Sequence, residues 1–376
     1  MGSIVVFCKT LVKGGAEKQA LTLAKLLTHK NLDVVVVSWS RKKVDPRNRN
    51  FIRDNSLKYY GLHGSLLMRF IQFNHIIRKE NAAVVLAYLT LANFVSGLSR
   101  LFNRGLITIG GIRTEKLPLY KLIVERFVHN RLNHATIFNN YSARGKFEGR
   151  GFNPAKIFVI HNAIAATKRD RPPKKADEIS IITVARFVRA KDFKTSLMAF
   201  KRLAESHPGR TIRYVLVGYG PMESEIRSMI RSHGLEGRVM LVINPPNVSD
   251  YLSEADIYLS TSLFEGLSNS LMEAMVAGLP IIATDVGDNY CLVKDGFNGY
   301  IVPLQNIEAT AAKLNTLVNS EEMRRTFGSN SNNLVSGEFN EEKFIDGYLG
   351  LIEKITNAFT NRQIPANEKA YTDPGL

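Results

Sequence analysis

Cysteine is scarce in this sequence, since Cys8 and Cys291 are the only two among 376 residues. Two cysteines cannot supply the disulfide framework of a small secreted domain or a zinc site built on cysteine ligands. The eight histidines show no metal-ligand spacing. We therefore expect a cytoplasmic protein, in a reducing compartment, that holds no metal.

A long apolar run is missing as well. The longest, residues 84–99, is interrupted by Thr90, Asn93 and Ser96, and it is shorter than the roughly 20 residues that a membrane-spanning helix needs. It predicts a buried strand followed by a helix. Apolar residues make up 45% and charged residues 22% of the chain, which is typical of a globular protein and excludes a disordered or coiled-coil chain.

Acidic residues are few in the first half of the chain. Residues 1–165 hold 26 lysines and arginines against eight acidic residues, whereas residues 166–376 hold 24 against 26. The net charge of +16 therefore arises entirely in the first half. A charge distribution this one-sided indicates an anionic partner: nucleic acid, a membrane surface or a phosphorylated substrate.

The length exceeds that of one compact core and predicts two domains. In both halves, continuous apolar strands alternate with amphipathic helices, the pattern of a parallel sheet covered on both faces. The strands predicted in the first half are residues 4–7, 34–38, 84–87, 106–109, 135–138 and 157–160. Those predicted in the second half are residues 179–184, 214–217, 239–243, 257–260, 280–283 and 300–302.

Between the two series, residues 165–177 are charged and contain two prolines, as a linker should. The prediction is an α/β protein with two Rossmann-like parallel-sheet domains, the first over 1–165 and the second over 166–340. An amphipathic helix over 341–359 is expected to return to the first domain, and the tail 360–376 is expected to be disordered. Ligands should bind at the carboxyl ends of the strands, in a cleft between the domains.

The strongest chemical signal lies after the strand predicted at 257–260. The following loop carries Glu265, and Glu273 comes in the early turns of a helix that starts near Asn269. Each carboxylate can accept hydrogen bonds from a pair of sugar hydroxyls. Three residues before the helix offer free backbone N–H groups that suit an anion: Gly266, Leu267 and Ser268.

This segment resembles the signature of the retaining GT-B glycosyltransferases of family 4, in which E-x7-E precedes A-x-G-x-P. The matching residues are Glu265, Glu273, Ala277, Gly278 and Pro280, with the small-residue spacing slightly altered because Ala277 and Gly278 are adjacent. The resemblance continues through residues 184–191, 217–221, 283–287 and 295–299. It is dense over 157–305 and thinner over 1–156.

The resemblance implies a metal-independent, retaining glycosyltransferase that moves a hexose or N-acetylhexosamine from a nucleotide diphosphate sugar, commonly a UDP-sugar, without a cofactor. In the family, the residues that match Arg186 and Lys191 bind the diphosphate, whose negative charge grows as the glycosidic bond breaks. The residue matching Glu265 contacts the donor sugar and completes the catalytic set. The implied donor-binding residues are Glu273, Gly266, Leu267, Ser268, Gly15, Gly218 and Ile243.

The first domain offers weaker candidates. Gly14 and Gly15 lie between a strand and a helix, where the backbone can pass close to a phosphate or a sugar; a tight turn is the structural alternative. Many family members carry a histidine after the fourth strand, where this sequence has Arg113. We assign Gly14, Glu17 and Arg113 to the acceptor or sugar side, and we interpret Asn162 as a hinge residue.

Two other functions fit parts of the sequence. A nucleic-acid-binding protein would explain the pI of about 9.7, but its basic residues should interleave with aromatics on one sheet face. Here they flank helices, so we expect no nucleic acid as partner. A sugar-nucleotide-binding scaffold without activity would have lost Glu265 or Arg186, and both are present.

The basic half instead predicts an anionic membrane surface and a glycan or lipid-linked acceptor, as in bacterial surface polysaccharide or lipopolysaccharide assembly. Residues 66–79 and 119–131 mix bulky apolar and basic side chains, as interfacial helices do. The alternative is that the apolar faces only pack on the sheet and the charge is solvated. The favoured location is peripheral, on the inner face of the cell membrane.

Overall fold

The structure, a computed structural model, describes residues 2–12, 14–165 and 178–363. They form two compact α/β units: the first comprises the described residues within 1–139, 143–161 and 341–376, and the second those within 140–142 and 162–340. Most of the expected linker, residues 166–177, lies outside the described residues, as does the expected tail from residue 364 onward. Within the described part of the chain, no helix is both long and apolar enough to cross a bilayer.

Seven parallel strands form the sheet of the first unit, in the order β3-β2-β1-β4-β5-β6-β7. The strands are β1 (Ser3–Cys8), β2 (Val34–Ser38), β3 (Lys58–Gly61), β4 (Ala82–Tyr88), β5 (Ile107–Ile112), β6 (Ala135–Phe138) and β7 (Ile157–Val159). The helices are α1 (Gly15–His29), α2 (Pro46–Asp54), α3 (Leu66–Lys79), α4 (Leu89–Ser99), α5 (Leu119–Phe127) with a π-helical turn (Val128–Leu132), α6 (Tyr141–Glu148) and, at the end of the chain, α14 (Glu341–Gln363).

Helices cover both faces of this sheet. The chain moves outward from β1 to β3 and then, in the other direction, from β4 to β7. Because parallel crossovers are right-handed, α1 and α2 lie on one face and α3, α4 and α5 on the other. The second face buries Phe7 of β1 against Phe73 of α3, whose rings stack at 4.2 Å, and the same core includes Val95 of α4.

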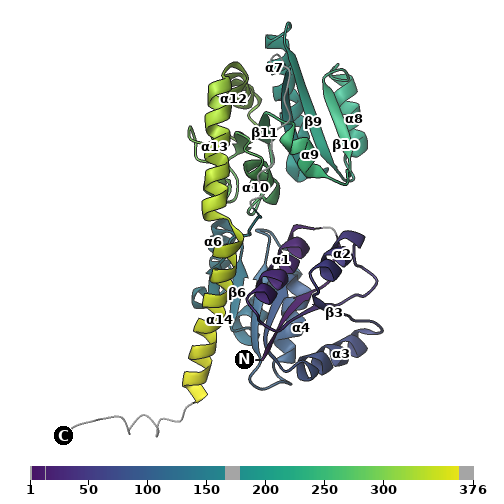
Figure 1. Cartoon of the computed structure of the whole chain (residues 1–376), viewed down its shortest axis with the longest axis vertical. Helices are drawn as coiled ribbons and strands as arrows, with labels where there is room; N and C mark the ends of the chain where they lie inside the picture. Colours follow the sequence, from purple (N-terminus) through teal and green to yellow (C-terminus); the bar gives the residue numbers. More distant parts are fainter. Residues whose placement is uncertain (1, 13, 166–177, 364–376) are drawn as a thin grey trace, which may run out of the picture. The chain divides into compact units, whose positions relative to one another are not determined.

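The helix α14 belongs to the first unit although it ends the chain. Figure 1 shows it in yellow beside the purple and blue elements of that unit. The hydroxyls of Tyr348 and Tyr88 lie 3.1 Å apart, which joins α14 to the end of β4. The helix continues to Gln363, four residues beyond the expected end at residue 359.

Two further differences from the prediction concern strands of the first unit. Strand β3 was not predicted, because it lies at the sheet edge, where Lys58 is exposed and the next three residues are half-buried. It therefore lacks the continuous apolar run that marks the inner strands. Strand β5 extends three residues beyond Ile109, since Gly110 and Gly111 continue the pairing with β6.

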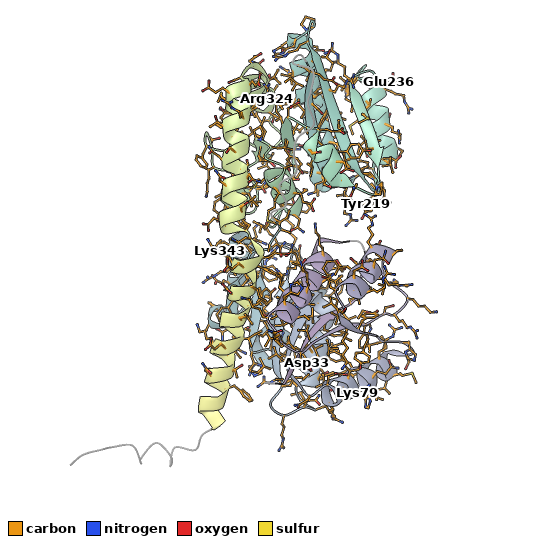
Figure 2. All side chains as sticks on the ribbon, in the orientation of Figure 1. Asp33, Lys79, Tyr219, Glu236, Arg324 and Lys343 are labelled. Carbon is orange, nitrogen blue, oxygen red and sulfur yellow. The ribbon has the colours of Figure 1, made fainter. Side chains whose placement is uncertain are left out.

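The second unit contains a six-stranded parallel sheet in the order β10-β9-β8-β11-β12-β13. The strands are β8 (Glu178–Arg186), β9 (Thr211–Tyr219), β10 (Val239–Ile243), β11 (Ile257–Ser260), β12 (Ile281–Thr284) and β13 (Gly299–Val302). The helices are α7 (Phe193–Ser206), α8 (Glu223–Ser232), α9 (Val248–Ser253), α10 (Asn269–Val276), α11 (Asn289–Leu292), α12 (Ile307–Asn319) and α13 (Glu321–Glu338). Tyr219 marks the carboxyl end of β9 in Figure 2. One apolar core lies on each face of the sheet.

Candidate active site

The candidate site of the second unit lies at the carboxyl ends of β8 and β11, which are neighbours in the sheet. Arg186 is the last residue of β8, and its side chain is exposed. Lys191 ends a short 3-10 turn, Arg189–Lys191, and Glu265 lies in the loop between β11 and α10. Because strands of a parallel sheet end at one edge, residues 74 positions apart in sequence meet there.

Lys191 and Glu265 form an ion pair. The Lys191 Nζ contacts Glu265 Oε1, and the two side chains are 19% and 13% exposed. Ser262 Oγ donates a second hydrogen bond to the same carboxylate oxygen at 2.8 Å. The structure thus joins two of the three predicted catalytic residues, and it adds Ser262, which sequence reasoning missed.

Hydrogen bonds between two loops hold this pair in place. The hydroxyl of Thr261 donates to the carbonyl oxygens of Lys191, at 3.2 Å, and Asp192, at 3.0 Å. The N–H of Leu263 donates to the carbonyl oxygen of Ala190 at 2.8 Å. The loop after β11 is therefore fixed against the turn after β8 by contacts that are independent of the ion pair itself.

Gly287 packs closely against the backbone of Glu265. It has φ of 55°, and a Cβ at this position would lie 2.2 Å from the carbonyl oxygen of Glu265. The N–H of the buried Asp288 donates to the carbonyl oxygen of Gly266 at 3.3 Å. A side chain at position 287 would therefore displace the loop that carries the carboxylate.

Both predicted carboxylates influence one buried phenol. Tyr258 of β11 is buried, and burial raises the pKa of its hydroxyl, which the charges of Glu265 and Glu273 raise further. Glu273 lies half-buried in α10. The two glutamates thus share one region of the second unit, near the amino end of α10.

The three residues before α10 differ in what they can offer a ligand. Ser268 is the N-cap of α10, and its Oγ accepts from the N–H of Leu271 at 3.5 Å. The side chain of Leu267 packs in the core, which leaves its backbone for contact with an anion. Asn162, interpreted above as a hinge residue, donates to Asn269 Oδ1 at 2.9 Å.

The remaining donor-binding candidates of this unit lie at strand ends. Gly218 belongs to β9, and a Cβ there would come within 1.9 Å of the Ala185 carbonyl oxygen. This close approach of β9 to β8 is sufficient reason for a glycine. Ile243 ends β10, with 38% of its side chain exposed.

Other parts of the recognised motif have structural roles. Gly278 has φ of 67° at the end of α10. A Cβ on Gly328 of α13 would lie 2.1 Å from the carbonyl oxygen of Gly278. In the segment 295–299, buried Asn298 accepts from the N–H of Lys294 at 2.7 Å and donates to Leu292. These residues end a helix and close a turn, so the motif combines chemistry with packing.

In the first unit, Gly14 is the N-cap of α1 with extended backbone, and Gly15 is the first helical residue. A Cβ on Gly14 would lie 2.3 Å from Glu17 Oε2, so the Glu17 side chain folds back toward the start of its own helix. Burial raises the pKa of Glu17, while hydrogen bonds to its own backbone and to Thr10 oppose that rise. The carboxylate therefore lies at the amino end of its own helix.

Arg113 follows β5 and is bound by two tyrosines that sequence reasoning missed. It donates to the Tyr348 hydroxyl at 2.6 Å, and its guanidinium carbon lies 4.9 Å from the ring centre of Tyr88. Burial raises the pKa of the Cys8 thiol; the charge of Glu17 raises it further and that of Arg113 lowers it. Arg113, Glu17 and Cys8 thus share the carboxyl edge of the first sheet.

Comparison with solved structures shows the class of fold. The chain superposes on Anabaena Alr3699/HepE, solved in complex with UDP, with a TM-score of 0.82 over 94% of this chain and 100% of that one, at 17% identity. The two parallel sheets therefore form a GT-B fold.

Residues 165–334 match the family model of the group 1 glycosyl transferases. This match confirms the similarity to group 1 glycosyl transferases noted in the sequence. A lipopolysaccharide core biosynthesis glycosyltransferase, LpsE of Rhizobium meliloti, is 23% identical over 90% of this chain and 96% of its own length. A 4-alpha-N-acetylgalactosaminyltransferase of Campylobacter jejuni, named for a diphospho-undecaprenol substrate, is 21% identical over 87% of this chain and 93% of its own length.

Proposed function

We propose that this chain is a retaining glycosyltransferase that moves a hexose or N-acetylhexosamine from a UDP-sugar to a glycan or lipid-linked acceptor. The observation that carries this proposal is the Lys191–Glu265 ion pair, with the exposed Arg186 at the same carboxyl edge of the second sheet. Two cations and a carboxylate at this edge suit a diphosphate bonded to a sugar.

Arg186 and Lys191 would stabilise the leaving group. When the glycosidic C–O bond breaks, its electron pair goes to the diphosphate oxygen, and fixed positive charge lowers the barrier. The ammonium group of Lys191 has three N–H donors, so it can keep Glu265 and still donate to a phosphate oxygen. The backbone N–H groups of residues 266–268 add donors for the same anion.

The two glutamates would hold hydroxyls of the donor. The Glu265 carboxylate accepts from Lys191 and Ser262 through Oε1, and its lone pairs outnumber these two donors. It can therefore accept from a sugar hydroxyl without losing either contact. Glu273, in α10, is assigned to the ribose.

The acceptor and location are proposed from the relatives and from charge. One relative is named for lipopolysaccharide core synthesis, and another for a sugar carried on diphospho-undecaprenol. Both names refer to a glycan that is joined to lipid. We therefore place this chain on the inner face of a cell membrane as a peripheral protein.

A panel of nucleotide sugars tests the proposal. One donor at 100-fold over its Kd should stabilise the chain by about 2.7 kcal/mol in thermal unfolding. Glu273→Ala should weaken binding of that donor by about 5- to 150-fold, because an unpaired hydroxyl contact costs roughly 1–3 kcal/mol. The exposed Glu254→Ala is the matched control.

Turnover then decides the reaction. Donor hydrolysis should occur without divalent metal and in EDTA, and NMR of a transfer product should show the donor's anomeric configuration. Donor binding without hydrolysis or transfer would identify an inactive scaffold. An inverted product, or loss of all activity in EDTA, would overturn the retaining, metal-independent mechanism.

A further inference from the structure

One face of the first unit exposes large apolar side chains. On α3, Leu67, Met68 and Ile71 are 70%, 51% and 59% exposed. Just beyond α4, on the same side of the sheet, Leu101 and Phe102 are 65% and 57% exposed. Soluble proteins seldom leave so many neighbouring apolar side chains in water unless the surface binds something.

Helix α5 exposes most of its large apolar side chains. Its outward stripe consists of Leu119, Ile123 and Phe127, at 72%, 52% and 56% exposure. Its buried residue is a carboxylic acid, Glu125, which accepts from Asn93 Nδ2 of α4 at 3.1 Å. A helix built to cover the sheet would turn its apolar stripe inward.

These elements form one continuous surface, which we name the α3–α5 face (α3, α4, residues 101–104 and α5). The rings of Phe70 in α3 and Phe102 lie 5.7 Å apart, and Arg78 Nε donates to Asn103 Oδ1 at 3.2 Å. These contacts join α3 to the end of α4. The contact between Asn93 and Glu125 joins α4 to α5 on its other side.

The charge on the α3–α5 face has one sign. Residues 62–134, all of which the structure describes, contain three acidic residues, and all three are buried: Glu80, Glu115 and Glu125. Glu80 pairs with Lys58 and Glu115 with Lys146, while Glu125 is held by Asn93. Several basic residues are exposed in the same segment, and Lys79 is labelled at the carboxyl end of α3 in Figure 2: Arg78, Lys79, Arg104, Lys116, Arg126 and Arg131.

We propose that the α3–α5 face docks on an anionic lipid bilayer, with its apolar side chains among the acyl chains and its basic residues among the headgroups. A second copy of this chain would bring like charges together, which disfavours self-association through this face. The link to a lipid-linked acceptor rests on the proposed function. Helix α5 begins six residues after Arg113, so the face borders the edge assigned to the acceptor.

The test uses the full chain with vesicles of phosphatidylcholine, alone or mixed with phosphatidylglycerol, at low and high salt. We expect binding to the mixed vesicles that salt weakens, and little binding to phosphatidylcholine alone. Arg104→Gln/Arg126→Gln/Arg131→Gln should weaken binding by about fivefold per charge. Leu119→Ser/Ile123→Ser/Phe127→Ser should weaken it by at least about 100-fold, since three apolar side chains lose their burial.

Matched controls lie on the second unit. Met240→Ser/Leu304→Ser removes exposed apolar side chains and Arg231→Gln/Arg325→Gln removes exposed charges; both should bind vesicles like the parent protein. Circular dichroism checks folding, and the α3 pair Leu67→Ser/Ile71→Ser replaces the α5 variant if that one fails to fold. Donor hydrolysis should be the same in all variants.

The outcomes separate the two proposals. Equal binding to both vesicle types, binding insensitive to salt, or parent-like binding by the face variants would overturn the docking surface. A dimer that the α5 variant dissociates would also overturn it, because a second copy would then be the occupant. Vesicle binding as expected, with no turnover of any donor, would instead leave the docking surface in place and refute the proposed function.

Discussion

Six strands follow the same order in both sheets, yet the two units place their charged side chains differently. In the second unit, charge gathers at the strand ends, where Lys191 and Glu265 are paired and their loops are joined by hydrogen bonds. In the first unit, the equivalent edge holds Arg113 between two tyrosines, and most of the charge lies on the outer helices. One fold thus supports a candidate catalytic edge in one unit and a candidate docking face in the other, because function depends on sites and not on strand order.

The largest expected effect tests whether the chemistry belongs to the second unit. Arg186→Ala and Lys191→Ala should each lower kcat by about 10²–10³-fold, because each removes positive charge from the leaving diphosphate. Lys194→Ala, an exposed lysine in the same region, should have little effect. Steady-state kinetics with the preferred donor measures kcat, and thermal unfolding measures the stability of each variant.

The first unit supplies the contrast for that experiment. Arg113→Ala removes the contacts to Tyr348 and Tyr88, and we expect it to lower stability and raise the KM for the acceptor more than it lowers kcat. A loss of kcat as large as that of Lys191→Ala would show that the first unit also takes part in the chemistry.

The second prediction concerns pH and the first unit. Burial raises the pKa of Glu125 from 4.5 to about 7, against the hydrogen bonds from Asn93 and Thr90. The folded state then holds a proton that the unfolded state releases, so stability is full below pH 4.5 and falls as pH rises toward about 7. The loss should be about 3 kcal/mol, at about 1.4 kcal/mol per pKa unit.

Glu125→Gln should remove this dependence, since an amide keeps the contact with Asn93 and does not titrate. Urea unfolding between pH 4.5 and about 7 measures the free energy of unfolding, with the exposed Glu342→Gln as the control. A parallel pH dependence in Glu125→Gln and the parent protein would contradict the assignment of the raised pKa to Glu125.

The third prediction separates backbone strain from displacement of the site. Gly287→Ala and Gly296→Ala both place a side chain at positive φ, 55° and 72°, which should cost about 1–3 kcal/mol of stability. At position 287 the new Cβ also meets the Glu265 backbone, whereas position 296 is open. Turnover should therefore fall in Gly287→Ala and stay near normal in Gly296→Ala; equal turnover in the two would refute the support role of Gly287.

The fourth prediction concerns a solvent-exposed ion pair, which should contribute little to stability. Arg202 and Glu308 form a pair in the second unit with side chains 52% and 66% exposed. Solvent screens such a pair, so Arg202→Ala should cost less than about 1 kcal/mol in urea unfolding. A larger loss would mean that this surface pair stabilises α7 against α12 in a way that its exposure does not indicate.

The fold was largely predictable because most strands are buried on both faces. Val34–Ser38, Ala135–Phe138 and Ile257–Ser260 form the strands that their apolar runs predicted. Edge strand β3 was missed, since one exposed lysine and three half-buried residues leave no apolar signal. Strand prediction from residue type and pattern depends on buried apolar side chains, and a strand at the edge of a sheet has fewer of them.

The α/β class, the second-unit motif with Glu265 and Glu273, and the concentration of positive charge in the first half can all be read from the amino-acid sequence. Which side chains meet depends on the packing of distant segments. Lys191 pairs with Glu265 because β8 and β11 are neighbours in the sheet, and Arg113 meets Tyr348 because the last helix returns to the first unit. Likewise, the sequence shows that α5 is amphipathic, but its pattern does not say which stripe faces inward. Packing against Asn93 settles that, since a buried carboxyl group needs a hydrogen-bond partner.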